Sequence, residues 1–256
     1  MQLDEDHTPE TTPREEDQPL VLETHGLDAG AGVIEDLHIG RGLNQILTGR
    51  ESHATTLALT LAGRMKPQAG HVAIGGENTP RGIAKHVALA GATELDGLER
   101  LVKLGQVIRE QYAWGSPWWR RVPRAEDIMA TEVWTSWAEP LGLMLDPTNR
   151  IGDLDVVDRL LVRVVLAGIA RPNAQLLLVD DIDQIRDIDA RHEALVALAR
   201  LAEKIPTVIM SVNHFEDDPF DACHRVRLIR REDKEATSPE VAVEDVVNDQ
   251  VEGGRN

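Results

Sequence analysis

Short apolar runs of strand length alternate with longer segments of helical period over most of this chain. The strand patterns are bounded by Gly, Pro and polar turn residues, and they cover residues 20–22, 32–39, 44–48, 71–74, 86–90, 176–181, 207–212 and 226–230. The helical patterns cover residues 55–65, 101–112, 125–137, 156–170 and 190–204. Two of the strand patterns are apolar throughout, which is typical of strands buried on both faces. The alternation predicts an α/β fold with a mostly parallel or mixed sheet flanked by helices.

The charge of the chain is concentrated at its two ends. The formal net charge is −17; residues 1–18 hold seven acids against one Arg, and residues 232–256 hold eight acids against one Lys and one Arg. Both ends are polar and lack aromatic residues, so we predict two disordered acidic tails around a single domain at 19–231. An acidic chain repels the phosphate backbone, which excludes nonspecific nucleic-acid binding from the expected functions.

Three further observations favour a cytoplasmic protein. Cys223 is the only cysteine, which excludes an intramolecular disulfide and a cysteine-based metal cluster and fits a reducing compartment. The N-terminus lacks the apolar segment of a secretory signal. The longest apolar run, at 160–170, contains Arg163 and is too short to span a bilayer.

The first candidate site is the loop that follows the strand pattern at 44–48. Residues 49–56 have the frame of a phosphate-binding loop, G-x-x-x-x-G-K-[ST], and begin correctly with Gly49. Ala54 stands where the second glycine is expected, and Thr55 stands where the lysine is expected. Thr56 keeps the hydroxyl that binds Mg²⁺ in such loops. The frame of the loop is therefore present while its main cation is missing.

Two other side chains in this loop carry or can acquire positive charge. Arg50 and His53 can partly replace the missing ammonium, or they are ordinary solvated loop residues, which is the simpler interpretation. The candidate nucleotide-binding residues are Gly49, Arg50, Ser52, His53, Ala54, Thr55 and Thr56.

The second candidate site is a pair of acids at the end of an apolar strand pattern. Asp180 and Asp181 end the run at 176–181. At the carboxyl edge of a sheet, one such acid can hold Mg²⁺ beside a nucleotide and the next can orient the attacking water. The alternative is a buried strand whose exit happens to be acidic. His214, which follows the strand pattern at 207–212, adds a third polar group.

These pieces together resemble the ATP-binding cassette (ABC) ATPases over about residues 20–231. The matching segments are LTGRESHATTLALTLAGRMKPQAGHVAIGG at 47–76, LLVRVVLAGIARPNAQLLLVDD at 160–181 and TVIMSVNH at 207–214. The resemblance implies a P-loop NTPase of the ABC type, with a mixed sheet flanked by helices and a helical subdomain inserted at about 95–155. It also implies ATP and Mg²⁺ as cofactors, and a peripheral location on the inner face of the cell membrane. The implied partners are a membrane-embedded transporter component and a second ATPase subunit, in a homodimer or a heterodimer.

The resemblance assigns a role to several of the residues already named. Residues 49–56 take the Walker A position, and Asp180 takes that of the Walker B aspartate. Asp181 takes the place of the catalytic glutamate, and His214 that of the switch histidine. Asp187 or Asp189 takes the place of the D-loop aspartate. The alternative is that these acids only stabilise a helix N-terminus through the helix dipole.

Several departures from the family pattern indicate a degenerate site. Thr55 cannot make the charged contact to phosphate, which is worth about 1.5–3 kcal/mol in binding. At 154–158, where the LSGGQ signature belongs, Val156 and Val157 replace two glycines, flanked by Asp155 and Asp158. No aromatic residue precedes Tyr112 to stack on adenine, and no glutamine lies at 90–92. Nucleotide binding is therefore expected to be weak and hydrolysis impaired.

All five tryptophans and the single tyrosine lie at 112–137, within the implied helical subdomain. Trp118, Trp119, Arg120 and Arg121 form an aromatic and basic run of the kind that anchors interfaces. We predict that this run docks on the membrane partner. The alternative is that the tryptophans fill the core of the subdomain, which is the expectation for the helical pair at 134 and 137.

The leading interpretation is the ATP-binding subunit of an ABC transporter with degenerate Walker A and signature motifs. A pseudo-ATPase that serves as an interaction module for a membrane partner is the alternative. A third possibility, a P-loop-like protein unrelated to transport, would be favoured by a structure without a helical arm.

Overall fold

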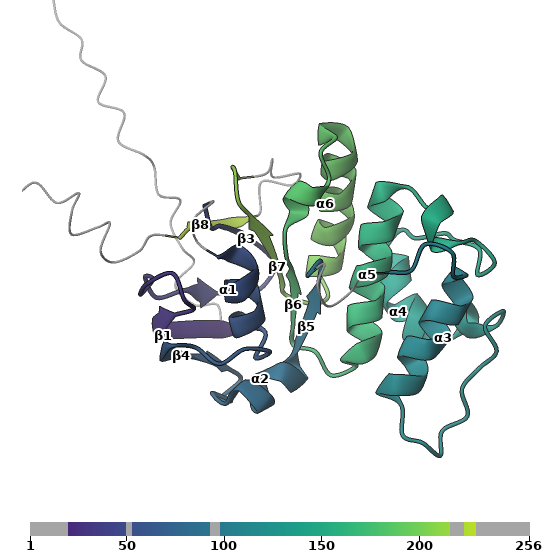
Figure 1. Cartoon of the computed structure of the whole chain (residues 1–256), viewed down its shortest axis with the longest axis horizontal. Coiled ribbons are helices and arrows are strands. Elements are labelled where there is room, and N and C mark those ends of the chain that lie inside the picture. Colours follow the sequence, from purple (N-terminus) through teal and green to yellow (C-terminus); the bar gives the residue numbers. More distant parts are fainter. Residues whose placement is uncertain (1–19, 50–52, 93–97, 216–222, 229–256) are drawn as a thin grey trace, which may run out of the picture.

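The computed structural model describes residues 20–49, 53–92, 98–215 and 223–228. The predicted tails at 1–18 and 232–256, together with Arg50 and Ser52 of the candidate loop, lie outside these residues. Within the described part, two sheets lie at one end of the molecule and a group of helices lies at the other (Figure 1).

The larger sheet contains five parallel strands in the order β5-β6-β7-β3-β8. Its strands are β3 (Leu43–Leu47), β5 (Val87–Ala90), β6 (Leu176–Val179), β7 (Thr207–Ser211) and β8 (His224–Arg227). Every residue of β3, β6 and β7 is buried, which confirms that the sheet contains strands buried on both faces. Because the strands are parallel, the loops that follow them meet at one edge of the sheet.

The smaller sheet is antiparallel, with the order β2-β1-β4. It consists of β1 (Leu22–Asp28), β2 (His38–Ile39) and β4 (Ala69–Ile74). The strand expected at 20–22 therefore begins later and extends further than predicted. The prediction of a long strand at 32–39 is wrong, because only the last two of these residues pair in a ladder.

A turn at Asp28 explains why the strand at 32–39 does not form. The Asp28 carboxylate accepts hydrogen bonds from the backbone N–H of Gly30 at 2.7 Å and of Gly32 at 3.2 Å. Both glycines have positive φ, 105° and 93°, so the backbone leaves the extended conformation there. Val33 keeps a single bridge to Asp28.

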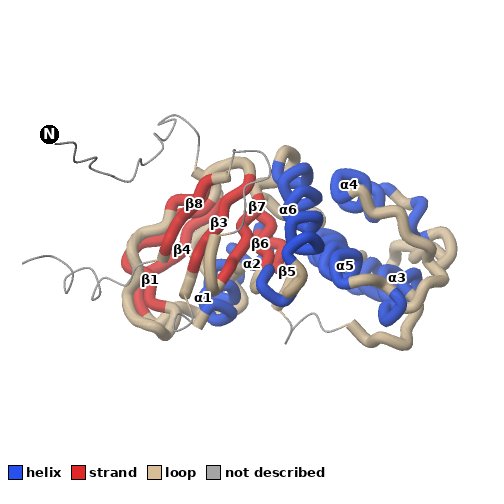
Figure 2. The backbone as a smooth tube through the Cα atoms, turned by 90° about the horizontal axis from the view of Figure 1, so that it is seen from above, coloured by secondary structure: helices blue, strands red, loops and turns tan. Residues whose placement is uncertain are grey.

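The described part of the chain contains six α-helices. They are α1 (Ala54–Leu61), α2 (Pro80–His86), α3 (Leu104–Gly115), α4 (Glu132–Leu141), α5 (Val156–Ala170) and α6 (Ile188–Ala202). Figure 2 shows α3, α4 and α5 grouped beyond α6, on the side away from β1. We refer to α3, α4 and the segments that connect them to β5 and α5 as the helical arm.

The helical arm corrects two of the predicted helix boundaries. The first helix begins at Leu104, not at 101, because the preceding residues pair with the segment before α5: Leu104 N–H donates to Asn149 O at 2.8 Å, and Ile151 N–H to Val102 O at 3.0 Å. The helix expected at 125–137 is interrupted at Thr131, whose hydroxyl donates to Ile128 O at 2.6 Å. A 3-10 turn precedes this residue, and α4 begins directly after it.

Helix α2 was not expected from the sequence, although its start signals are present. Thr79 caps the helix by accepting a hydrogen bond from the N–H of Gly82 at 3.1 Å, and Pro80 occupies the first turn. The helix has only seven residues, so it lacks the repeated apolar positions that identify a longer helix.

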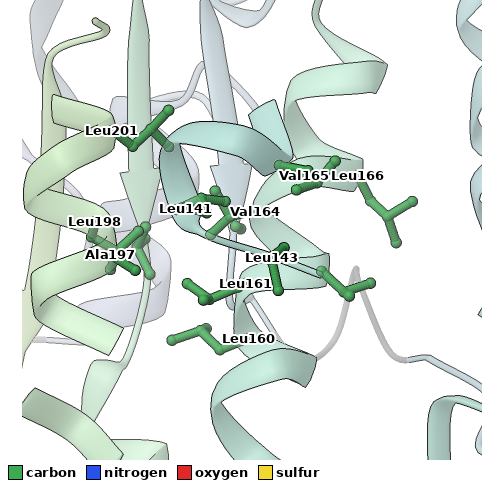
Figure 3. Close-up of a cluster of buried hydrophobic side chains, with 14 of the residues drawn as sticks. Leu141, Leu143, Leu160, Leu161, Val164, Val165, Leu166, Ala197, Leu198 and Leu201 are labelled. Carbon is green, nitrogen blue, oxygen red and sulfur yellow. The ribbon is translucent and has the colours of Figure 1, made fainter. Parts of the chain in front are cut away.

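Two apolar cores hold the elements together. One core lies under the small sheet and α1, and includes Leu22, Leu57 and Leu176. The other joins the opposite face of the large sheet to the helices, with α5 at its centre. Figure 3 shows side chains of α5, such as Leu161 and Val164, packed with Leu198 of α6 and Leu141 of α4. In the residues that the structure describes, no helix has both the length and the apolar character needed to cross a bilayer.

Candidate functional site

The candidate site lies where four parallel strands end. Leu47 of β3 pairs in register with Ser211 of β7, and Val179 of β6 pairs with Ala90 of β5. Thr48 extends the first pairing, since its N–H and its hydroxyl both donate to Ser211 O, at 2.9 and 3.1 Å. The residues that follow these strands are Gly49, Asp180, Val212 and Gly91. The fold therefore gathers the loop, the acid pair and the segment of His214 at one edge, as the sequence predicts.

Helix α1 begins directly after the candidate loop. Its N-cap is His53, in the left-handed conformation (φ 51°, ψ 51°) and with no side-chain hydrogen bond to the first turn. Ala54, Thr55 and Thr56 form that first turn. The N–H groups of a first helical turn lack intrahelical partners and point along the axis with the positive end of the helix dipole, which suits an anion.

The side chains of the first turn of α1 partly fit a bound Mg²⁺-nucleotide. Thr56 is half-buried, and within the described ranges its hydroxyl is not engaged in any hydrogen bond. It can serve as a Mg²⁺ ligand. Thr55 supplies a second hydroxyl but no positive charge, so the turn offers phosphate its backbone dipoles without a cation.

Asp180 is buried at the exit of β6, with an exposed fraction of 1%. Its N–H donates to Ala90 O at 2.8 Å, which fixes the acid beside the end of β5. Gly91 has φ 86°, and a Cβ at this position would lie 2.2 Å from Asp180 O. A glycine is thus required for this close approach. A carboxylate held in this way is a suitable hard ligand for Mg²⁺.

Asp181 follows in a strained conformation, with φ 51°. Burial raises the pKa of this carboxyl, and the nearby charge of Asp183 raises it further. Gln184 lies one turn onward and donates from Nε2 to Gly91 O at 3.0 Å. The segment after β6 is thereby tied to the end of β5, and Asp181 is held at the same edge.

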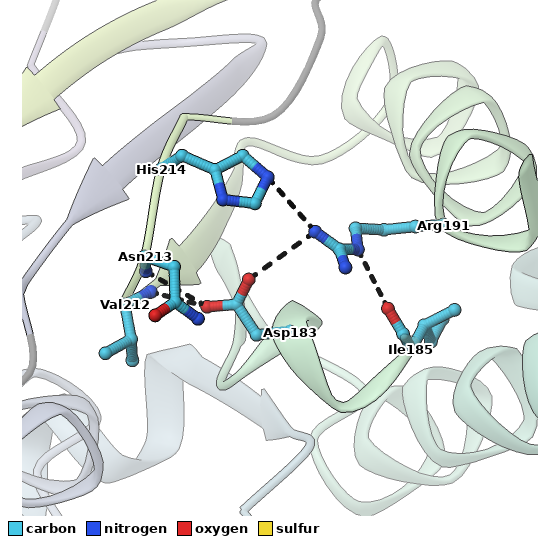
Figure 4. Close-up of polar contacts among 6 residues, drawn as sticks. All are labelled: Asp183, Ile185, Arg191, Val212, Asn213 and His214. Atoms are coloured by element: carbon cyan, nitrogen blue, oxygen red, sulfur yellow. Dashed lines mark hydrogen bonds and ion pairs between the residues drawn. The ribbon is translucent and has the colours of Figure 1, made fainter. Parts of the chain in front are cut away.

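His214 belongs to a polar cluster that sequence reasoning did not anticipate (Figure 4). Its Nε2 lies 3.2 Å from Nη1 of Arg191, a residue of α6. Arg191 also lies 3.6 Å from Oδ1 of Asp183 and donates from Nε to Ile185 O at 2.8 Å. A guanidinium can only donate hydrogen bonds, so the imidazole nitrogen Nε2 of His214 is the acceptor in this contact.

Asp183 connects this cluster to the end of β7. Its Oδ2 accepts hydrogen bonds from the N–H groups of Val212 at 2.7 Å and of Asn213 at 3.4 Å. The exit of β7 and the segment after β6 are thereby held together. One signal in the sequence could have revealed the cluster: Arg191 falls on the apolar stripe of its helix with Leu195 and Leu198. A charged side chain on the buried face of a helix is unfavourable unless an opposite charge or hydrogen-bonding group is buried beside it.

The expected signature segment lies at the N-terminus of α5. Asp155 caps the helix by accepting a hydrogen bond from the N–H of Asp158 at 2.8 Å. Partial burial raises the pKa of Asp158, and the charges of Asp155 and Glu193 raise it further. Val157 is buried. This helix N-terminus therefore carries its own carboxylate where a phosphate would otherwise be accommodated.

Comparisons with known proteins agree with this geometry. No family model matches the chain. A Rhizobium meliloti (strain 1021) protein named as a ribose/galactose/methyl galactoside import ATP-binding protein is 28% identical over 218 residues, which cover 80% of this chain and 39% of that protein. The chain thus spans about two fifths of the length of this curated relative.

Three solved structures share the architecture. The cbiO1 protein of Clostridium perfringens, part of the cbiONQ ABC transporter complex, superposes with a TM-score of 0.63 at 15% identity, covering 82% of this chain and 87% of that one. A nucleotide-free ATP-binding cassette of an ABC transporter gives 0.60 at 13% identity, covering 90% and 100%. A cassette in its ADP conformation gives 0.60 at 15% identity, covering 82% and 90%. The chain has the fold of an ABC ATPase domain.

The ABC-type fold accounts for the helical arm. The arm is present between β5 and α5, so the interpretation as a P-loop-like protein without such an arm loses its support.

Asp187, one of two candidates for the D-loop aspartate, caps α6 by accepting a hydrogen bond from the N–H of Ala190 at 2.9 Å. Asp189 lies in the first turn of the same helix. Both acids therefore lie at the N-terminus of α6, where a negative charge interacts favourably with the helix dipole.

Four of the five tryptophans of the ABC-type arm form two groups. Trp134 is buried, and Trp137 packs on Gly168 of α5, where an added Cβ would lie 2.1 Å from Cε2 of the indole. Trp118 and Trp119, in contrast, are 92% and 72% exposed, and their rings meet edge to face at 5.8 Å. The core interpretation therefore holds for the first pair, and the second pair is available to a partner.

The two arginines next to the exposed pair complete the predicted docking run. Arg120 lies over the ring of Tyr112 at 5.8 Å, which links the loop to α3, and Arg121 is exposed beside it. A cation over an aromatic face is a favourable contact that orders the loop.

Proposed function

We propose that this chain is the ATP-binding subunit of an ABC transporter, with a degenerate site that binds Mg²⁺-ATP weakly and hydrolyses it poorly. The observation that carries the proposal is the convergence of Asp180 with the first turn of α1 at one edge of the sheet. At this edge, Asp180 and Thr56 would hold Mg²⁺, which neutralises phosphate charge when bound. Thr55 provides no ammonium, so the affinity for nucleotide is low.

The same proposal covers the expected partners. The exposed Trp118, Trp119, Arg120 and Arg121 would dock the subunit on a membrane-embedded component at the cytoplasmic face of the membrane. Asp155 and Asp158 repel an anion at the N-terminus of α5, which argues against a catalytically competent homodimer. A second ATPase subunit with intact motifs would supply one complete half-site in a heterodimer.

The nucleotide site is tested by thermal unfolding with and without Mg²⁺-ATP. Binding to the folded state raises the melting temperature by mass action. We expect a small rise for the natural protein at millimolar nucleotide and none for Asp180→Asn. Asp127→Asn is the matched control, because this exposed aspartate lies in the helical arm, and it should keep the rise. Absence of any rise in the natural protein would contradict nucleotide binding.

The exposed tryptophan pair favours a second function, that of a non-catalytic interaction module. This pseudo-ATPase would bind its membrane partner without binding nucleotide. Capture of the purified membrane component would then fail in Trp118→Ala/Trp119→Ala and survive in Asp180→Asn. The control is Leu101→Ala/Met144→Ala, which removes two other exposed apolar side chains of 73% and 95% exposure. Capture that persists in the tryptophan double variant would show that the docking surface is elsewhere.

A further inference from the structure

A basic surface pocket lies at the amino-terminal edge of the large sheet, opposite the candidate nucleotide site. It has a volume of about 340 Å³ and is lined by Arg81, Ala84, Lys85, Arg171, Pro172 and Asn173. Its walls are α2, which leads into β5, and the turn between α5 and β6. The Asp180 edge is formed by the other ends of these strands, so the two sites are separate.

Arg171 is held in place by the backbone around it. Its Nε donates to Ala84 O at 2.8 Å, and its Nη1 donates to Ala170 O at 2.6 Å. These contacts tie the turn after α5 to α2 and fix the plane of the guanidinium. A guanidinium has five N–H donors in a rigid fork, so the remaining donors stay available to a ligand.

Arg64 adds a fourth cation beside the pocket. The preceding Gly63 has φ 65°, and a Cβ there would lie 2.4 Å from Pro80 O, so the end of α1 is packed directly against α2. Partial burial lowers the pKa of Arg64, and the positive charge of Arg171 lowers it further. The two guanidinium groups are therefore close enough to repel one another.

Among the residues that the structure describes, these four cations have no counter-charge in contact with them. Across residues 20–49, 53–92, 98–215 and 223–228, no carboxylate oxygen lies within 4.0 Å of Arg64, Arg81, Lys85 or Arg171. The chain as a whole carries a net charge of −17, so acids are abundant elsewhere. Like charges that converge without neutralisation form a site of positive potential that attracts an anion.

We propose that this pocket binds a small anion with several negative charges, of the phosphate or carboxylate class. Its volume is that of a small-molecule site. The negative net charge of the chain opposes binding of a nucleic acid, which would contact a much larger surface than the pocket. The guanidinium of Arg171 provides bidentate recognition, and Arg81 and Lys85 provide two mobile cations one helical turn apart on the opposite wall. This site does not depend on the proposed ATPase function.

The test is isothermal titration with pyrophosphate and with citrate at physiological ionic strength. The variant is Arg81→Ala/Lys85→Ala, which removes two exposed cations that make no ion pair in the described residues. The matched control is Arg200→Ala/Lys204→Ala, an exposed Arg–Lys pair with the same spacing near the end of α6. Both variants lose the same charge, so a nonspecific electrostatic effect would weaken them equally.

We expect at least one of the two probes to bind the natural protein and to bind the Arg81→Ala/Lys85→Ala variant about tenfold more weakly or worse. The control variant should bind within about twofold of the natural protein. Amide chemical-shift changes should fall at 81–85, 171 and 173. A preference for pyrophosphate or for citrate identifies the class of ligand. Equal losses in both variants, no binding of either probe, or shifts confined to residues 53–56 would overturn the proposal.

Discussion

The guanidinium of Arg191 lies 3.2 Å from Nε2 of His214, and it also faces Asp183 at 3.6 Å. The arginine and the aspartate are both about 10% exposed at their side chains. Asp183 in turn accepts hydrogen bonds from the backbone at the end of β7. The histidine at the candidate site is therefore positioned by a buried ion pair from α6 and from the segment after β6.

Removal of the Arg191 side chain should destabilise the protein. Arg191→Met leaves the carboxylate of Asp183 buried without its cation, and breaking a buried pair in this way costs about 3–5 kcal/mol. We expect a loss of about 3 kcal/mol in the free energy of unfolding, measured by urea denaturation. Arg200→Met, an exposed arginine of the same helix, should change it by less than about 0.5 kcal/mol. Equal effects of the two changes would show that the pair contributes no stability.

The position of Thr55 should control nucleotide affinity. Thr55→Lys restores an ammonium at the start of α1, and a hydrogen bond from a charged group is worth about 1.5–3 kcal/mol. We expect Mg²⁺-ATP to bind roughly tenfold to a hundredfold more tightly, as measured by fluorescence or calorimetric titration. Thr55→Met has a similar length without the charge and should give no increase. If lysine and methionine had the same effect, the missing cation would not be what limits binding.

The carboxyl of Asp158 should make stability depend on pH in a defined direction. Partial burial, Asp155 and Glu193 raise its pKa, so the folded protein binds this proton more tightly than the unfolded chain does. Stability from this group is therefore lost as pH rises from about 4 through the raised pKa. Asp158→Asn should increase the melting temperature at pH 7, and the increase should vanish below about pH 4.

Asp146 provides the opposite case. Hydrogen bonds from the hydroxyl and N–H of Thr148, at 2.6 and 2.7 Å, lower its pKa. Its ionised form thus stabilises the fold above about pH 4, and this contribution is lost as pH falls through the lowered pKa. Asp146→Asn should lower the melting temperature at pH 7 but not in acid. If Asp158→Asn and Asp146→Asn changed the melting temperature at pH 7 in the same direction, the opposite pKa shifts of the two carboxyls would be contradicted.

The two groups of tryptophans should differ in their effect on stability. Trp134 is 3% exposed, so Trp134→Ala leaves a cavity in the helical arm and should cost about 3–5 kcal/mol. Trp118→Ala, at 92% exposure, should change the free energy of unfolding by less than about 0.5 kcal/mol. Chemical denaturation of both variants measures this difference. A large loss in Trp118→Ala would mean that its loop is part of the core and not a docking surface.

The sequence predicted the parts of the site that depend on local pattern. The apolar strands that end just before Thr48 and Asp180 follow from composition and length, and parallel pairing then brings their ends together. Arg191 was missed because its contacts come from residues 183 and 214, and periodicity within one helix does not reveal its partner. The strand at 32–39 was predicted wrongly because the carboxylate of Asp28 forms a turn that alternation of apolar residues does not report.

Isothermal titration of the purified protein with Mg²⁺-ATP determines whether the edge formed by Asp180 and the first turn of α1 is a nucleotide site of low affinity. We predict saturable binding that is weak, requires Mg²⁺, and is lost in Asp180→Asn while the melting temperature without ligand is retained. Tight binding, or weak binding that Asp180→Asn leaves unchanged, would contradict this account of the site.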